Sequence, residues 1–245
     1  SYKNLRWHFQ MQELEKEELP PKIRKYFERK FKLLEPELQE IMRFAALWKK
    51  SFLLKETAEV LSYSLIKVSA RIDRLKNLNL LVQPAKSVSF HYPFLRNIVC
   101  QNSEKNELNG FRRKIISYLE KRKELLPEEE MLLFSHYANL PKNKKMLSFG
   151  KALQMKFKKD IEKIIATGKE IFKHRKELEK IGSEDVVFLL NNYAWALDRI
   201  ADYELALSVF REVWELGKSG VNQNLKNEIF VRNLYFLNRE SKFAE

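Results

Sequence analysis

Residues 53–96 read LLKETAEVLSYSLIKVSARIDRLKNLNLLVQPAKSVSFHYPFLR. Apolar residues recur at helical spacing on both sides of a Ser-Tyr-Ser break, which predicts a short helix over 53–61 and a second helix over 65–77. Residues 80–82 and 88–90 are rich in Leu, Val and Phe and flank a Pro-Ala-Lys-Ser turn, so they predict a short β-hairpin. This stretch therefore predicts a helix, a turn, a helix and a hairpin in succession.

Two further helices precede this stretch, and each begins at a proline. Pro36 opens a helix that reaches about residue 48, and Pro21 lies in the first turn of another that reaches residue 34, because proline is tolerated at the start of a helix. Three helices followed by a two-stranded wing is the order of a winged helix-turn-helix. We therefore predict a winged-helix domain over residues 35–103, with residues 1–34 as a linker helix and the remnant of a preceding domain.

The rest of the chain shows the helical period throughout. The predicted helices span about 94–101, 107–123, 128–139, 143–156, 160–180, 185–199, 203–217 and 224–239. Short breaks separate them, as is typical of antiparallel helical repeats. The predicted fold class is mainly α: a winged helix-turn-helix with a short β-hairpin, followed over residues 104–245 by an antiparallel helical superhelix resembling tetratricopeptide repeats (TPR-like).

One helical hairpin carries a repeat signature. Small residues fall where its two helices would touch, and the aromatic Tyr203 follows the turn, as in a TPR hairpin. The pattern returns 40 residues later, where Leu237, Arg239 and Phe243 align with Leu197, Arg199 and Tyr203. Because the second hairpin lacks its second helix at Glu245, we expect the chain to be a piece of a longer protein.

The composition narrows the class of protein. The chain has only six Gly and seven Pro among 245 residues, too few for a turn-rich β fold. The single Cys100 cannot form an internal disulfide, and the first residues lack a secretory signal, so we expect a cytoplasmic protein. No apolar run approaches the ~18 residues of a membrane span, so no membrane association is expected.

The net charge of +13 is spread unevenly. Residues 142–180 hold 13 Lys or Arg against 5 acidic residues. Lys169, Lys173, Lys176 and Lys180 recur there at helical spacing, which we interpret as a solvated face of a helix.

The sequence offers no pattern typical of catalysis or metal binding. Gly217-Lys218-Ser219 resembles the end of a phosphate-binding loop, but Glu212 stands where the motif needs a glycine, so we interpret Gly217 as a helix terminus. The four histidines, at positions 8, 91, 136 and 174, are too far apart for a metal motif. We predict that this chain is not an enzyme and binds neither a metal nor a cofactor.

Four segments resemble the region that follows the nucleotide-binding module in bacterial signal-transducing ATPases with numerous domains, the AAA-related STAND class. They are LPPKI at 19–23, LLEPELQEI at 33–41, RFAAL at 43–47 and FHYPFLR at 90–96. The resemblance implies a winged helix that serves as a hinge between an ATPase core and a TPR-like sensor arm. It also implies that ATP or ADP binds elsewhere in the full-length protein.

The resemblance also draws attention to two residues at the end of the wing. The family pattern places a His where this chain has Tyr92, and in related nucleotide switches that His contacts bound ADP. A tyrosine can donate a hydrogen bond to a phosphate, and His91 lies beside it. Tyr92 and His91 are therefore candidates for nucleotide sensing, and the alternative is that Tyr92 only packs at this junction.

Two sets of binding candidates remain. Lys67, Arg71 and Arg74 share one face of the 65–77 helix, where they could contact DNA or an acidic surface of the ATPase. On the TPR-like arm, the candidates for a ligand surface are Asn191, Asn192, Trp195 and Asp198. Asn side chains suit a peptide backbone, and the alternatives are that they are only solvated and that Trp195 belongs to the core.

These observations predict a monomeric, non-catalytic regulatory region whose TPR-like arm binds a protein, a peptide or a small inducer. The first alternative is a transcription factor that contacts DNA through its winged helix. The second is the regulatory region of a nucleotide cyclase or protein kinase, since only the output domain would differ.

Overall fold

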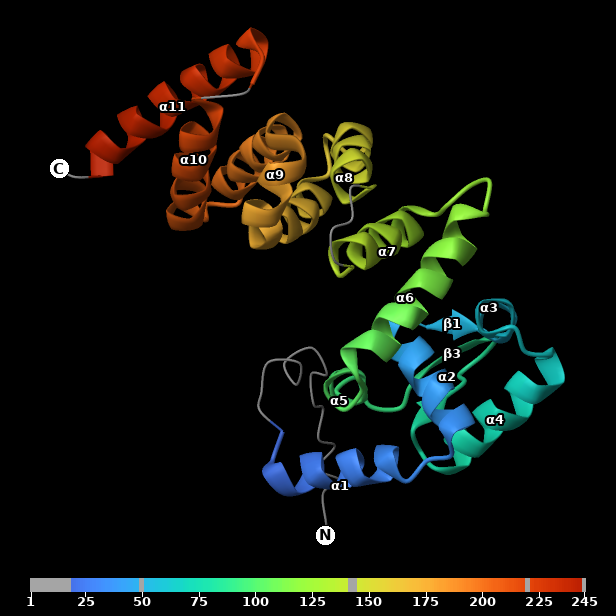
Figure 1. The fold of residues 1–245 in the computed structure, drawn as a ribbon. Helices are drawn as coiled ribbons and strands as arrows, with labels where there is room; N and C mark the ends of the chain where they lie inside the picture. The colour runs from blue at the N-terminus through green and yellow to red at the C-terminus, as the bar shows by residue number, and fades with distance from the viewer. Residues whose placement is uncertain (1–18, 49–50, 141–144, 219–220, 244–245) are drawn as a thin grey trace. The chain divides into compact units, whose positions relative to one another are not determined.

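The computed structural model describes residues 19–48, 51–140, 145–218 and 221–243, and this part of the chain is mainly helical with a small antiparallel sheet (Figure 1). Contacts divide the chain into two compact units, Ser1–Lys121 and Arg122–Glu245. The sequence had placed residues 104–121 with the helical repeats, whereas their helix packs within the first unit. Among the described residues, no helix is both long and apolar enough to cross a membrane.

The first unit contains six helices and three short strands among its described residues. They are α1 Pro21–Lys32, α2 Pro36–Leu47, β1 Phe52–Leu53, α3 Leu54–Leu61, α4 Leu65–Asn77, β2 Leu81–Val82, β3 Ser87–Phe90, α5 Leu95–Gln101 and α6 Lys105–Glu120. The strands form one antiparallel sheet in the order β1-β3-β2. The helices and the hairpin lie close to their predicted bounds, and β1 is an addition that the sequence analysis did not predict.

The turn between α3 and α4 explains why these two helices form separately. Ser62 ends α3 in the left-handed conformation, with φ of 58°, and the Ser64 hydroxyl accepts a hydrogen bond from the backbone N–H of Lys67 at the start of α4. The fully buried Val68 and Ile72 then turn one side of α4 to the core. Local capping together with apolar spacing thus specifies these two helices and the turn between them.

Strand β1 is positioned by its phenylalanine. Phe52 is 1% exposed and meets the ring of Phe44 on α2 edge to face, with 5.3 Å between centroids. It pairs with Val88 of β3, which is also buried. The core of the first unit therefore lies between α2, α4 and one side of this sheet.

All the regular elements among the described residues of the second unit are helices. It contains α7 Pro127–Ala138, α8 Lys145–Lys156, α9 Ile161–Arg199, α10 Tyr203–Gly217 and α11 Gln223–Phe243. Helix α9 is interrupted at Gly182, whose φ of −171° and ψ of 85° are not helical. Its two halves, here called α9a (161–181) and α9b (183–199), correspond to the two helices predicted for this region.

Helices α9a and α9b pack closely against one another. Gly168 of α9a faces the ring of Tyr193 on α9b, and a Cβ atom at position 168 would lie 2.3 Å from the Tyr193 Cγ atom. Phe172 adds a ring contact with Tyr193, with 6.4 Å between centroids. The missing side chain of Gly168 is what permits this approach.

A buried polar cluster joins α8 to both halves of α9. The Gln154 amide of α8 is 3% exposed and donates to the Thr167 hydroxyl at 3.1 Å and to the carbonyl of Leu189 at 3.4 Å. Its oxygen accepts a hydrogen bond from Asn192 at 3.2 Å. Because buried polar groups need partners, this cluster fixes how the three helices meet.

The last helix differs from the repeat prediction. The alignment placed a turn just before Phe243, but α11 continues without a break to that residue. The first hairpin turns at Ala201, whose φ of 63° is left-handed, whereas the aligned residue, Ser241, lies within α11. The side chains of Leu237, Arg239 and Phe243, on which the alignment rested, lie outside the described residues.

Candidate functional site

Two of the three cations predicted on α4 have acidic partners at the start of α2. The Arg71 side chain is 11% exposed, forms an ion pair with Glu37 at 2.5 Å and lies over the Tyr63 ring, 4.2 Å from its centroid. The Tyr63 hydroxyl in turn donates to Glu40. Arg71 thus fastens α4 and the preceding turn to α2.

Arg74 makes a similar contact at the surface. Its guanidinium donates to both carboxylate oxygens of Glu35, at 2.8 and 2.6 Å. This bidentate hydrogen bond lowers the pKa of the Glu35 carboxyl below its ordinary value. The charges of Arg71 and Arg74 are therefore compensated within the first unit.

The exposed side of α4 has a different character from the predicted basic face. Ile66 is 82% exposed and Leu65 is 54% exposed, and the exposed Asp73 lies further along the helix. Lys67 is exposed, and none of the described residues forms an ion pair with it. The acidic residues at 35, 37 and 40, at the start of α2 and within it, are the sequence signal that Arg71 and Arg74 would be paired.

Tyr92 packs in an aromatic cluster against helix α1. Its ring stacks on Phe94, with 5.4 Å between centroids and 10° between planes, and meets Phe27 of α1 at 5.7 Å. The His91 ring is exposed and touches Tyr92 edge to face, while the His91 backbone N–H donates to the Leu80 carbonyl at 3.0 Å. The structure therefore places the two predicted residues side by side at the surface, with Tyr92 packed on aromatic neighbours.

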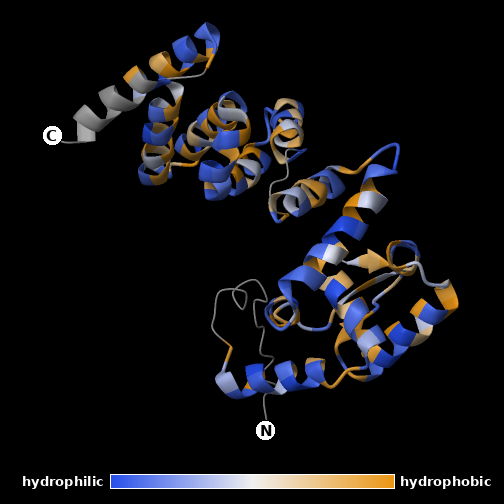
Figure 2. Cartoon of the chain, in the orientation of Figure 1, coloured by the Kyte–Doolittle hydropathy of each residue, from blue (hydrophilic) through white to orange (hydrophobic). Residues whose placement is uncertain are grey.

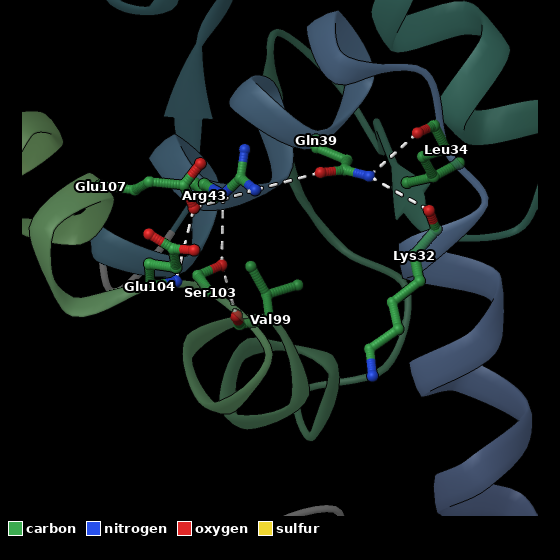
Figure 3. Close-up of polar contacts among 8 residues, drawn as sticks. All are labelled: Lys32, Leu34, Gln39, Arg43, Val99, Ser103, Glu104 and Glu107. Carbon is green, nitrogen blue, oxygen red and sulfur yellow. Dashed lines mark hydrogen bonds and ion pairs between the residues drawn. The ribbon is translucent and has the colours of Figure 1, made fainter.

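Arg43, in the segment RFAAL, organises the polar contacts of the first unit (Figure 3). Its side chain is 11% exposed, donates to the Ser103 hydroxyl at 3.2 Å and the Gln39 amide oxygen at 3.0 Å, and forms an ion pair with Glu107 at 3.1 Å. Gln39 donates to the carbonyl of Leu34 at 2.9 Å. These contacts tie the end of α1, helix α2 and the junction of α5 with α6, and sequence analysis missed them because Ser103 lies 60 residues away from Arg43.

In the second unit, two of the four predicted ligand residues are buried. Asn191 is 0% exposed, and its amide donates to Glu228 of α11 at 3.3 Å while its backbone carbonyl accepts from Arg232 at 3.1 Å. Asp198 is 8% exposed. Asn191 and Asp198 therefore do not lie on an open ligand surface, because the packing of the helices covers them.

The other two residues lie on a partly exposed line along α9b. Its members are half-buried, except the exposed last one, and they recur every three or four residues, which keeps them on one side of a helix. We call this line the α9b stripe: Asp185, Phe188, Asn192, Trp195 and Arg199. Asn192 and Trp195 were predicted, whereas Phe188 was missed although it lies four residues before Asn192.

Neighbouring helices extend the α9b stripe on both sides. Lys151 of α8 pairs with Asp185 at 2.6 Å, and its ammonium lies 5.4 Å from the Phe188 ring centroid. Arg232 of α11 lies 5.2 Å from the Trp195 ring, and Tyr235 meets Trp195 edge to face at 5.5 Å. Aromatic rings, an amide and cations from α8, α9b and α11 are thus brought to one surface.

The described residues provide no group of three His, Cys, Asp or Glu side chains that could hold a metal ion. Cys100 is half-buried, and desolvation raises the pKa of its thiol, which disfavours the reactive thiolate. The α9b stripe and its neighbours offer aromatic rings, an amide and charged side chains.

Comparisons of the chain with protein-family models, with curated proteins and with solved structures found no match.

Proposed function

We propose that this chain is a non-catalytic regulatory region of a STAND-class signal-transducing ATPase. In this proposal the first unit is a winged-helix hinge, and the second unit is a TPR-like arm that binds a peptide segment of a partner protein along the α9b stripe. The chemistry of that stripe is the single observation that carries the proposal.

The order of elements in the first unit supports the winged-helix part. Helix α2, strand β1, helices α3 and α4, and the β2–β3 hairpin follow one another, and β3 lies between the other two strands. Arg71 is nearly covered where it pairs with Glu37, and the exposed Arg74 pairs with Glu35, so both arginines of α4 are engaged at the start of α2. A helix held in this way suits a rigid hinge element better than a helix that reads DNA, which needs free donors at its exposed face.

The contacts of the second unit support the TPR-like part. One side of the helical array contains α8, α9b and α11, which are linked in turn by Asn192 with Gln154 and by Asn191 with Glu228. Helices α9a and α10 are linked separately, by the Arg175–Glu212 ion pair at 2.5 Å. Alternate helices that contact one another in two rows are the arrangement of a helical repeat array.

The α9b stripe has the groups that an extended peptide requires. Phe188 and Trp195 offer apolar surface for side chains, and between them the Asn192 amide oxygen, which the Gln154 contact does not use, can accept a hydrogen bond from a peptide backbone. Arg199 adds an exposed cation at one end. We therefore expect a partner segment with apolar residues two to four positions apart.

Selection of random displayed peptides on the full chain tests this proposal. For a selected peptide, we expect Trp195→Ala to weaken the dissociation constant about tenfold or more, and Asn192→Ala to weaken it several-fold. Trp214→Ala on α10 is the matched control and should stay within about twofold. Equal binding to the Trp195→Ala variant, or failure to select any peptide, would contradict the proposal.

A further inference from the structure

Helix α1 carries a concentrated positive charge on the first unit. Its 12 residues include six Lys or Arg and one Glu, and Figure 2 shows a mostly hydrophilic helix. We propose that the outer face of α1 is a docking surface for an acidic protein surface that also presents apolar side chains. This inference goes beyond the proposed function, because it concerns the first unit alone and does not depend on what the second unit binds.

One side of α1 is already used for packing within the unit. Phe31 is 3% exposed, and the Phe27 ring contacts Phe94 with 5.3 Å between centroids. These contacts fix the rotation of the helix about its axis. The side that remains open is therefore a defined surface.

That open side combines cations with exposed apolar groups. Lys22, Tyr26, Arg29 and Leu33 follow one another at spacings of four, three and four residues, which places them on one face. Leu33 is 86% exposed and Tyr26 is 57% exposed. A shallow hollow of about 450 Å³ runs along this face, lined by Lys22, Lys25, Tyr26, Arg29, Lys30 and Leu33.

Most of the cations on α1 lack an acidic partner in the described part of the chain. Arg24 pairs with Glu28 at 3.1 Å, and the Lys30 ammonium donates to the carbonyl of Leu78 at 2.6 Å. No described carboxylate forms an ion pair with Lys22, Lys25, Arg29 or Lys32. Uncompensated charges of one sign favour a partner of the opposite sign.

The exposed apolar groups of α1 indicate whether the acidic partner is a nucleic acid or a protein. Phosphate groups of a nucleic acid would satisfy the cations but would gain nothing from Leu33 or from Ile23, which is 43% exposed. A protein surface with carboxylates around apolar side chains satisfies both kinds of group, as interfaces with an apolar centre and a polar rim do. The face of α1 therefore fits an acidic protein better than a nucleic acid.

Binding of a designed acidic peptide to the full chain tests the inference. The probe is a fluorescein-labelled helical peptide of about 20 residues that carries Glu and Leu on one face. Its binding is measured by fluorescence anisotropy at low salt. We expect Lys22→Glu/Lys25→Glu/Arg29→Glu to weaken binding about tenfold or more. Tyr26→Ser keeps the charge of α1 and should weaken binding about threefold. This single variant tests the surface even if the triple variant does not fold.

A charge-matched control separates this surface from net charge. Lys169→Glu/Lys173→Glu/Lys176→Glu changes three exposed cations on α9a by the same amount and should leave binding within about twofold. The inference is overturned if this control weakens binding as much as the α1 variant, or if the wild-type chain binds no peptide at low salt. It is also overturned if duplex DNA or phosphatidylserine vesicles displace the peptide at equal charge concentration.

Discussion

At the scale of single residues, the role of Arg71 distinguishes two interpretations of α4. In one the helix is held to α2 as a structural element, and in the other it binds DNA. Its guanidinium is nearly covered and contacts Glu37 and the Tyr63 ring. We expect Arg71→Ala to lower the free energy of unfolding by about 1–2 kcal/mol, because an ion pair, a cation–π contact and side-chain packing are lost together. Lys67→Ala, at an exposed position on the same helix, is the control, and it should change the free energy of unfolding by no more than about 0.5 kcal/mol. Urea denaturation of the two variants measures both values.

The opposite pattern would favour the transcription-factor alternative. In that case both variants would leave stability unchanged, and both would reduce the binding of random duplex DNA in a gel-shift titration at low salt. DNA binding that disappears with Lys67, Arg71 and Arg74 replaced by Ala would then revive the predicted basic face.

At the scale of elements, the close contact between α9a and α9b depends on Gly168. A methyl group there would overlap the Tyr193 ring, so we expect Gly168→Ala to destabilise the second unit by about 1–3 kcal/mol. Gly110 in α6 is the matched control, since no atom lies within 4 Å of a Cβ built there. Gly110→Ala should be neutral or stabilising by up to about 1 kcal/mol, because alanine favours the helix.

Thermal unfolding followed by circular dichroism compares the two glycine variants. If Gly168→Ala were as well tolerated as Gly110→Ala, the packing of α9a on α9b described here would be wrong.

The helices and their bounds were the features best predicted from the sequence, because capping and apolar spacing act locally. Prolines at the starts of α1 and α2, and Ser64 before α4, gave these helices clear beginnings. Strand β1 has only two residues, too few to show an alternating pattern, and its formation depends on distant Val88. The turn predicted before Phe243 failed for a related reason, since an alignment of residue types does not show whether a position adopts the left-handed conformation of Ala201.

The candidate site was predictable only in part, for a similar reason. Asn192 and Trp195 lie on the partly exposed α9b stripe, but Asn191 is covered by Glu228 and Arg232 from α11. Sequence spacing shows which residues share a face of one helix, and it does not show which neighbouring helix covers that face. Arg43 is a further case, because its partner Ser103 lies 60 residues away, between α5 and α6.

At the scale of the whole molecule, the two units present surfaces of different chemistry. The first unit presents the cations and apolar side chains of α1, and the second presents the aromatic and amide groups of the α9b stripe. The net charge of +13 alone would suggest nucleic acid as the common partner. The ion pairs of Arg71 and Arg74 and the apolar groups on both surfaces favour protein partners instead.

Hydrogen exchange of the full chain, measured with and without a selected peptide, tests most directly whether the α9b stripe is the binding surface. We predict slower exchange in α9b (183–199) and in the adjoining parts of α8 and α11, because a bound peptide restricts local opening of the helices that it contacts. Exchange in α10 and in the first unit should stay unchanged. Protection confined to α10 or to the first unit would contradict the account.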